Sequence, residues 1–172
     1  MGTTSSVAMM VEALGLTLPG TSVIPENDPA RKVAAFNSGR EIVKMVNNEV
    51  IPSKLLTPAA FRNAMRVLHA CGGSTNAIIH LLAISGRIDG GLTLGAINEL
   101  SKGLAVIADV EPSGAKLIQD FNKAGGLPAL IANCGENFEL DEKTLIGKSW
   151  REIVKGVSPT NNTIRTLHDP IY

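Results

Sequence analysis

Residues 57–82 read TPAAFRNAMRVLHACGGSTNAIIHLL, and this stretch contains two helical patterns joined by a pair of glycines. Thr57-Pro58 is a typical helix start, because threonine can cap a helix and proline fits its first position. Apolar residues follow at the i, i+3, i+4 and i+7 spacing of one helix face: Phe61, Ala64, Met65 and Leu68. After the glycines, Ser74 can cap a second helix, whose expected buried residues are Ala77, Ile78, Leu81 and Leu82. The stretch therefore predicts two helices that each bury one face.

The same reasoning predicts further helices on both sides of this stretch. Helical patterns cover residues 7–14, the segment from Asp28-Pro29 to Pro52, and residues 93–100, 117–121 and 150–154. Residues 127–132 are ambiguous, and Pro128 favours a helix start over a central strand. Two segments of strand length, residues 104–108 and 163–167, are expected to form short strands. The sequence thus predicts an α/β, helix-rich fold in which helices pack on a small, mostly parallel sheet, with residues 1–172 forming a single subdomain.

The last part of the chain has a different character. Residues 133–172 are polar, are interrupted by glycines and end in the linker-like string Asp169-Pro170-Ile171-Tyr172. The first residues already belong to a helix start. These features predict a segment of a longer protein, whose tail leads into a C-terminal domain outside this chain.

Composition argues against several classes of function. Hydrophobic residues make up 44% of the chain and aromatic residues only 3%, which predicts an aliphatic core. The 16 Lys and Arg residues balance 16 Asp and Glu residues, so net charge favours neither nucleic acid nor an anionic membrane. No signal-peptide pattern is present, and no apolar run reaches the roughly 18 residues that suggest a membrane span. The expected location is cytoplasmic.

The polar residues around the glycine pair form the first candidate site. Glycine lets the backbone approach a ligand closely, and the free N–H groups at a helix start attract anions. A substrate carboxylate would suit this position, which comprises Gly72, Gly73, Ser74, Thr75 and Asn76. The alternative is a plain helix cap after a glycine turn. The string is not a phosphate loop, because it lacks the lysine and the spacing of that motif.

Other polar residues give weaker signals. Thr3-Thr4-Ser5-Ser6 is a second hydroxyl-rich helix start, for which exposed capping hydroxyls are the alternative interpretation. A metal site needs three or four ligands at suitable spacing, which the set His69, Cys71 and His80 does not provide. Cys71 is instead expected to be a small buried residue. Carboxylates after a predicted strand can act as acid or base, although a solvated turn is the simpler interpretation of Asp109 and Glu111.

Several strings together resemble the family of dihydroxy-acid and sugar-acid dehydratases, which includes phosphogluconate dehydratases. In chain order they are MGTTSS (1–6), EALGLTLPG (12–20), ACGGSTNAIIHL (70–81), PSG (112–114), KAGGLPA (123–129) and TIR (163–165). They occur in the order typical of the family and extend over nearly the whole chain. The most specific of them is GGSTN followed by an apolar helix that carries His80.

The resemblance implies a hydro-lyase that removes water from a 2,3-dihydroxy carboxylate to give a 2-keto acid. Enzymes of this family use an iron–sulfur cluster as Lewis acid, together with a divalent cation, usually Mg²⁺. The family's cluster cysteines, Mg²⁺ ligands and catalytic serine match no position of this chain, so the segment alone is expected to hold no metal and to be inactive. The resemblance places Thr3, Thr4 and Ser5 near the cluster and residues 72–76 near the active-site cleft.

The sequence leaves the substrate and two other functions open. The segment 25–52 leans slightly toward sugar-acid dehydratases, and the branched-chain dihydroxy-acid enzyme is nearly as well supported. The whole enzyme is expected to act on a small hydroxy acid and to form a homo-oligomer. The alternatives are a stand-alone carboxylate-binding module and a structural module that dimerises through an exposed apolar face.

Overall fold

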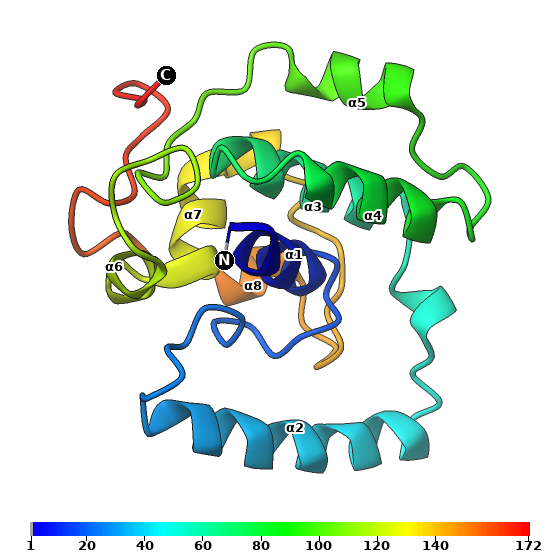
Figure 1. Cartoon of the computed structure of the whole chain (residues 1–172). Helices are drawn as coiled ribbons and strands as arrows, with labels where there is room; N and C mark the ends of the chain where they lie inside the picture. The colour runs from blue at the N-terminus through cyan, green and yellow to red at the C-terminus, as the bar shows by residue number, and fades with distance from the viewer. Residues whose placement is uncertain (1) are drawn as a thin grey trace.

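The computed structural model describes residues 2–172, and Met1, the first residue of the MGTTSS string, lies outside the described part. Figure 1 shows the arrangement of the helices. They are α1 (Gly2–Ala13), α2 (Ala30–Asn47), α3 (Pro58–Ala70), α4 (Asn76–Ser85), α5 (Leu94–Ser101), α6 (Ile118–Lys123), α7 (Gly126–Cys134) and α8 (Trp150–Ile153). Short 3-10 turns occupy Pro52–Lys54 and Gly135–Asn137. Every helix that the apolar spacing predicts is therefore confirmed.

Helix α1 lies in the middle of the molecule, and α3, α4 and α7 pack around it (Figure 1). The core that they share is largely aliphatic, as the composition predicts. Its large, fully buried apolar side chains include Met9, Met10, Leu14, Phe61, Leu81, Ile107, Phe121, Leu127, Leu130, Ile131 and Trp150. Full burial of one such side chain stabilises the fold by about 1.5–3 kcal/mol. Because α1 and α4 pack against one core, the positions of their first residues are fixed relative to each other.

Helix starts follow the capping chemistry that the sequence suggests. The Thr57 hydroxyl accepts a hydrogen bond from the Ala60 N–H at 3.0 Å, and the Asp28 carboxylate accepts one from the Ala30 N–H at 2.9 Å. Thr93 caps α5 in the same way. Each such cap contributes about 1 kcal/mol to helix stability. These ends are therefore fixed by local sequence.

The predicted parallel sheet is not found in the part of the chain that the structure describes. Within that part, residues 104–108 belong to no helix or strand, and their one bridge is an isolated antiparallel one between Ala108 and Ile164. The N–H groups of Ile107 and Ala108 both donate to the carbonyl of Ala70, at 2.9 and 3.1 Å, at the end of α3. Since the backbone of this apolar run is satisfied by a helix end and by the tail, it needs no neighbouring strand here. The fold is helix-rich, as predicted, without a demonstrated sheet.

The polar region after residue 133 is bound to α3. The buried Asn63 side chain donates to the Glu139 carbonyl at 3.0 Å and accepts from the Glu139 N–H at 2.8 Å. Partial burial acts to raise the pKa of the Glu139 carboxyl, but hydrogen bonds from Arg62 and Arg66 outweigh it and lower that pKa. Residues 133–143 are thus held in place through both backbone and side-chain contacts.

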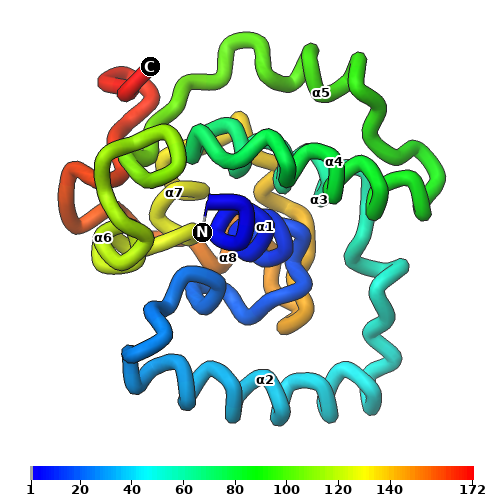
Figure 2. Tube along the Cα trace, viewed as in Figure 1, coloured from blue at the N-terminus to red at the C-terminus, as the bar shows by residue number. Residues whose placement is uncertain are grey.

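Helix α2 differs from the other long helices, because none of its residues is buried. The chain trace in Figure 2 shows it running beside the core helices rather than among them. Its exposed apolar side chains include Phe36 at 68% and Val46 at 70%, together with Val33, Ile42 and Val43. Exposed apolar surface of this kind is typical of an interaction face. No helix within residues 2–172 combines the length and hydropathy required to cross a bilayer.

Candidate functional site

The two hydroxyl-rich helix starts that the sequence singles out meet in the folded chain. The Thr3 Oγ1 atom in the first turn of α1 lies 2.8 Å from the Oγ atom of Ser74, which precedes α4. The Asn76 Nδ2 group, at the first position of α4, donates to the same Thr3 Oγ1 atom at 3.3 Å. Thr3 lies 71 positions before Ser74, so only the tertiary fold brings them together. We call Thr3, Ser74 and Asn76, with the backbone that carries them, the paired helix starts.

Ser74 does not cap α4, so that prediction is wrong. Helix α4 has no side-chain cap hydrogen bond, because the Ser74 hydroxyl faces Thr3 instead. The other predicted hydroxyls are not drawn into the contact: Thr4 and Thr75 are exposed and Ser5 is partly exposed. Among residues 2–172, the side chains of these three make no hydrogen bond. Thr4, Ser5 and Thr75 are therefore close to the contact in sequence but take no part in it.

The glycine pair allows the two helix starts to approach. Gly72 has a φ of 53°, in the left-handed region that favours glycine, and its carbonyl accepts a hydrogen bond from the Ser113 hydroxyl. A Cβ atom on Gly73 would meet the Leu68 side chain and would lie 3.0 Å from the Ser6 Oγ atom. A larger residue at Gly73 would therefore push the end of α3 away from α1, and one at Gly72 would press on Ser113.

Two hydroxyls that hold this arrangement, those of Ser6 and Ser113, were not among the predicted site residues. The Ser6 hydroxyl donates to the Gly2 carbonyl at 2.7 Å and accepts from the Ser74 N–H at 3.0 Å. The i, i+4 spacing of Gly2 and Ser6 signals the first of these bonds, which is a common one for serine in a helix. No sequence signal points to Ser74 as the second partner. Ser113 belongs to the PSG string, where it had no assigned role.

The electrostatics of the paired helix starts favour an anion. Helix N-termini carry partial positive charge and free N–H groups. Neither α1 nor α4 has an acidic residue in its first turn that would neutralise this charge. The linked side chains add two hydroxyls, which donate and accept, and one amide. This arrangement suits an oxygen-rich anion such as a hydroxy carboxylate.

The other residues that the sequence raised as candidates, Cys71, His69 and Asp109, make contacts within the fold. Burial raises the pKa of the Cys71 thiol and raises the pKa of the Cys134 thiol to about 12, so both are uncharged near neutral pH. Cys71 is buried, as predicted. The His69 Nε2 atom lies 3.0 Å from a main-chain carbonyl oxygen, and Asp109 holds a turn by accepting from the Ala115 N–H at 2.8 Å. Within the described part of the chain, no group of three or more His, Cys, Asp or Glu side chains could hold a metal ion.

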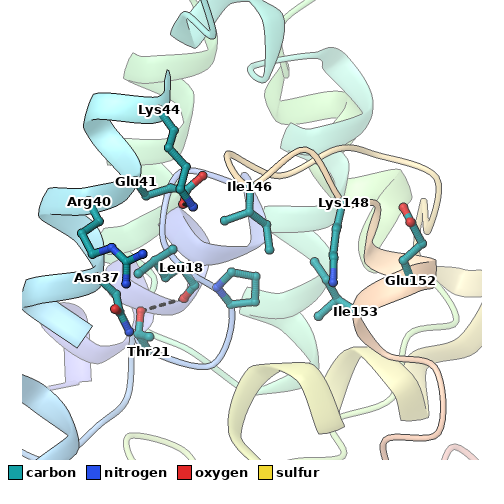
Figure 3. Close-up of a pocket in the computed structure, with 11 residues that line it drawn as sticks. Leu18, Thr21, Asn37, Arg40, Glu41, Lys44, Ile146, Lys148, Glu152 and Ile153 are labelled. Atoms are coloured by element: carbon teal, nitrogen blue, oxygen red, sulfur yellow. Dashed lines mark hydrogen bonds and ion pairs between the residues drawn. The ribbon is translucent and has the colours of Figure 1, made fainter. Parts of the chain in front are cut away.

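A cavity of about 550 Å³ lies between α2 and the rest of the molecule (Figure 3). Arg40 and Lys44 of α2 line one side, and Lys148 and Glu152 line the other. Lys44 is paired with Glu41 at 2.7 Å. The apolar lining consists of Leu18, Pro19, Ile146 and Ile153. None of the predicted site residues lines this cavity, which is therefore separate from the paired helix starts.

The described residues form a helix-rich fold in which two polar helix starts meet. The chain belongs to the dihydroxy-acid/6-phosphogluconate dehydratase family, because the N-terminal domain profile of that family matches residues 1–153. The resemblance drawn from the sequence strings is thus confirmed.

Curated relatives include both branches of the family. The chain is 43% identical to an L-arabinonate dehydratase of Rhizobium leguminosarum bv. trifolii (strain WSM2304), over 89% of the chain and 27% of the relative. It is 43% identical to an L-arabonate dehydratase of Azospirillum brasilense, over 95% of the chain and 29% of the relative. It is 34% identical to a dihydroxy-acid dehydratase of Prochlorococcus marinus (strain MIT 9301), over 100% of the chain and 32% of the relative. The chain therefore spans less than a third of the length of these relatives.

Proposed function

We propose that residues 1–172 form a single subdomain in the N-terminal domain of a hydro-lyase that dehydrates a 2,3-dihydroxy carboxylate to a 2-keto acid. The observation that carries the proposal is the contact of Thr3, Ser74 and Asn76 at two helix starts, in a chain of the dehydratase family. A hydroxy acid offers a carboxylate to the helix starts and hydroxyls to their side chains. The linked groups are hydroxyls and an amide, which do not titrate near neutral pH. The 172-residue chain alone is therefore expected to be inactive.

In this proposal the paired helix starts hold and orient the substrate. The N–H groups of Thr75 and Asn76 at the start of α4 bind its carboxylate. Those of Ser74, Ala77 and Ile78 already donate within the fold. The hydroxyls of Thr3 and Ser74 contact a substrate hydroxyl, and the Asn76 amide orients the Thr3 hydroxyl by donating to it. The other predicted residues complete the polar lining: Gly72, Gly73, Thr75, Thr4 and Ser5. The chain thus contributes positioning rather than proton transfer.

The family resemblance implies an iron–sulfur cluster, which supplies a Lewis acid for the leaving hydroxyl, and Mg²⁺. The described residues do not fit either group. They contain no set of three potential ligands, and burial raises the pKa of both cysteine thiols, which opposes the thiolate form that metals bind. We propose that the ligands of both groups lie outside residues 2–172, with Thr3, Thr4 and Ser5 near the cluster but not bound to it.

Sequence identity favours a sugar acid as substrate. The chain shares 43% identity with two sugar-acid dehydratases and 34% with the dihydroxy-acid dehydratase described above. This difference agrees with the slight preference drawn from the segment 25–52. A branched 2,3-dihydroxy acid is the alternative substrate.

Two substitutions test this function in the full-length dehydratase that contains these residues. Ser74→Ala combined with Asn76→Ala is expected to lower kcat/KM for L-arabinonate roughly 10- to 100-fold, since each hydrogen bond lost to a neutral substrate hydroxyl costs about 0.5–1.5 kcal/mol. Formation of the 2-keto acid measures the rate, with a branched dihydroxy acid as the second substrate. Ser38→Ala, at an exposed position of α2, is the matched control. An unchanged kcat/KM in the double variant would remove substrate binding from this site, and inactivity of the unsubstituted enzyme on both acids would refute the function.

A structural module that pairs through α2 is the second candidate function. The observation that favours it is the exposed apolar set on α2, which includes Phe36 and Val46. Sedimentation of the 172-residue chain distinguishes the two. A dimer that Phe36→Glu converts to a monomer would support the structural module, and a monomer at all concentrations would remove it.

The proposal also concerns the surroundings of these residues in the whole enzyme. We expect a cytoplasmic homo-oligomer that acts on a small hydroxy acid, with residues 133–172 leading into a further domain. A small parallel sheet in the whole enzyme would be built from segments other than 104–108, because the N–H groups of that run already donate to the carbonyls of Ala70 and Tyr172.

A further inference from the structure

We propose that Ser6 is a positioning residue for the paired helix starts: its hydroxyl sets where α4 begins relative to α1. The inference rests on the proposed function in so far as the paired helix starts bind the substrate. Ser6 is 1% exposed and lies below the surface that Thr3 and Ser74 share. It would therefore act through Ser74 rather than by touching a ligand.

The two hydrogen bonds of Ser6 show which group donates in each. Its hydroxyl proton is committed to the Gly2 carbonyl, at 2.7 Å. The oxygen is thereby free to accept the Ser74 N–H, at 3.0 Å. This second bond fixes the backbone of Ser74, whereas the 2.8 Å contact between Thr3 and Ser74 joins only side chains. A backbone bond constrains the start of α4 itself.

The glycine pair shows that the approach is close. A Cβ on Gly73 would lie only 3.0 Å from the Ser6 Oγ atom, so a glycine is needed for Ser6 to come this near. On the other side of the turn, the Ser113 hydroxyl donates to the Gly72 carbonyl. The turn between α3 and α4 is thus held from two sides, by α1 through Ser6 and by the loop at Ser113.

Loss of the Ser6 hydroxyl should remove one of the two hydrogen bonds that fix the turn between α3 and α4. The Ser74 N–H would then have no partner in α1, and the backbone that carries Ser74 and Asn76 could shift. Binding groups displaced by about 1 Å lose much of their effect, because productive geometry is narrow. The consequence would be local to the start of α4, since the core residues of α1 do not depend on this bond.

Amide hydrogen exchange of the 172-residue chain tests the positioning role. In Ser6→Ala, the Ser74 N–H is expected to exchange roughly tenfold faster relative to the Leu130 N–H in the core helix α7, the ratio that loss of one such hydrogen bond gives. Comparison with Leu130 separates a local release from general destabilisation, even if the variant is less stable. Ser38→Ala on exposed α2 serves as the control and should leave both rates unchanged. Equal acceleration at Ser74 and Leu130, or none at either, would refute the positioning role.

Kinetics of the full-length dehydratase separate this role from the proposed function. Ser6→Ala is expected to raise KM for L-arabinonate roughly tenfold and to change kcat by less than about twofold, because the substituted group only orients binding groups. Fast local exchange with this KM change supports both inferences. Fast local exchange with an unaltered KM would show that Ser6 positions α4 but that the paired helix starts do not bind the substrate, which would remove substrate binding from this site.

Discussion

Trp150→Ala is expected to lower the free energy of unfolding of the 172-residue chain by about 4 kcal/mol, the usual cost of truncating a fully buried tryptophan. Trp150 is 0% exposed. Its indole Nε1 donates to the Ala13 carbonyl at 3.3 Å, at the end of α1, and its ring meets Phe138 edge to face with centroids 6.0 Å apart. The substitution therefore removes apolar contact, an aromatic pair and a bond to a helix end together.

Urea unfolding followed by circular dichroism measures this loss, because the variant has no tryptophan left to report by fluorescence. Phe36→Ala is the matched control: it truncates an aromatic residue that is 68% exposed, and it should change stability by no more than about 0.5 kcal/mol. A cost below about 1 kcal/mol for Trp150→Ala would mean that residues 138–154 do not form part of the cooperative core.

The helices could be predicted from the sequence because their determinants are local. The cap on Thr57 and the apolar spacing that follows it involve residues within two turns of one another, and the structure contains the expected helix. The same applies to α7, where Pro128 favoured a helix over a central strand. Helix α2 shows the limit of this reasoning, because the pattern predicts the helix but does not reveal that none of its residues is buried.

The sheet and the site depend on tertiary partners, which local patterns do not specify. An apolar run such as residues 104–108 looks the same whether it pairs with strands or packs against the end of a helix. Both hydroxyl clusters were identified separately, yet their contact through Thr3 and Ser74 joins residues 71 positions apart. Ser6 belongs to the first of these clusters, but no sequence pattern indicates that it is buried or that it accepts from the Ser74 N–H.

The buried carboxylate of Glu12 carries a second large expected effect. Glu12 is 0% exposed at the end of α1. Its two oxygens accept hydrogen bonds from the Gly20 N–H at 2.6 Å and from the Ser22 N–H at 2.9 Å. These bonds fold the loop after α1 back onto the helix. Desolvation by burial raises the pKa of Glu12 above its ordinary value of 4.5, and the hydrogen bonds from Ser22 and Gly20 offset only part of that rise.

Glu12→Ala is expected to cost about 3 kcal/mol of unfolding free energy, because it leaves two backbone N–H groups without acceptors. The cost should depend on pH. Since the pKa is raised on folding, the titration of Glu12 stabilises the native state fully below pH 4.5, and this contribution is lost as pH rises through the folded-state pKa. Alanine does not titrate, so the difference between the two proteins isolates this group.

Urea unfolding followed by the fluorescence of Trp150 gives that difference at each pH. The cost of Glu12→Ala should be largest in acid and should shrink toward neutral pH, while Glu26→Ala, at an exposed position of the following loop, should cost little at any pH. A cost that grows as pH rises would mean that the folded chain favours the ionised carboxylate. The two N–H bonds would then outweigh desolvation, and the ionised form of Glu12 would be the one that stabilises the loop after α1.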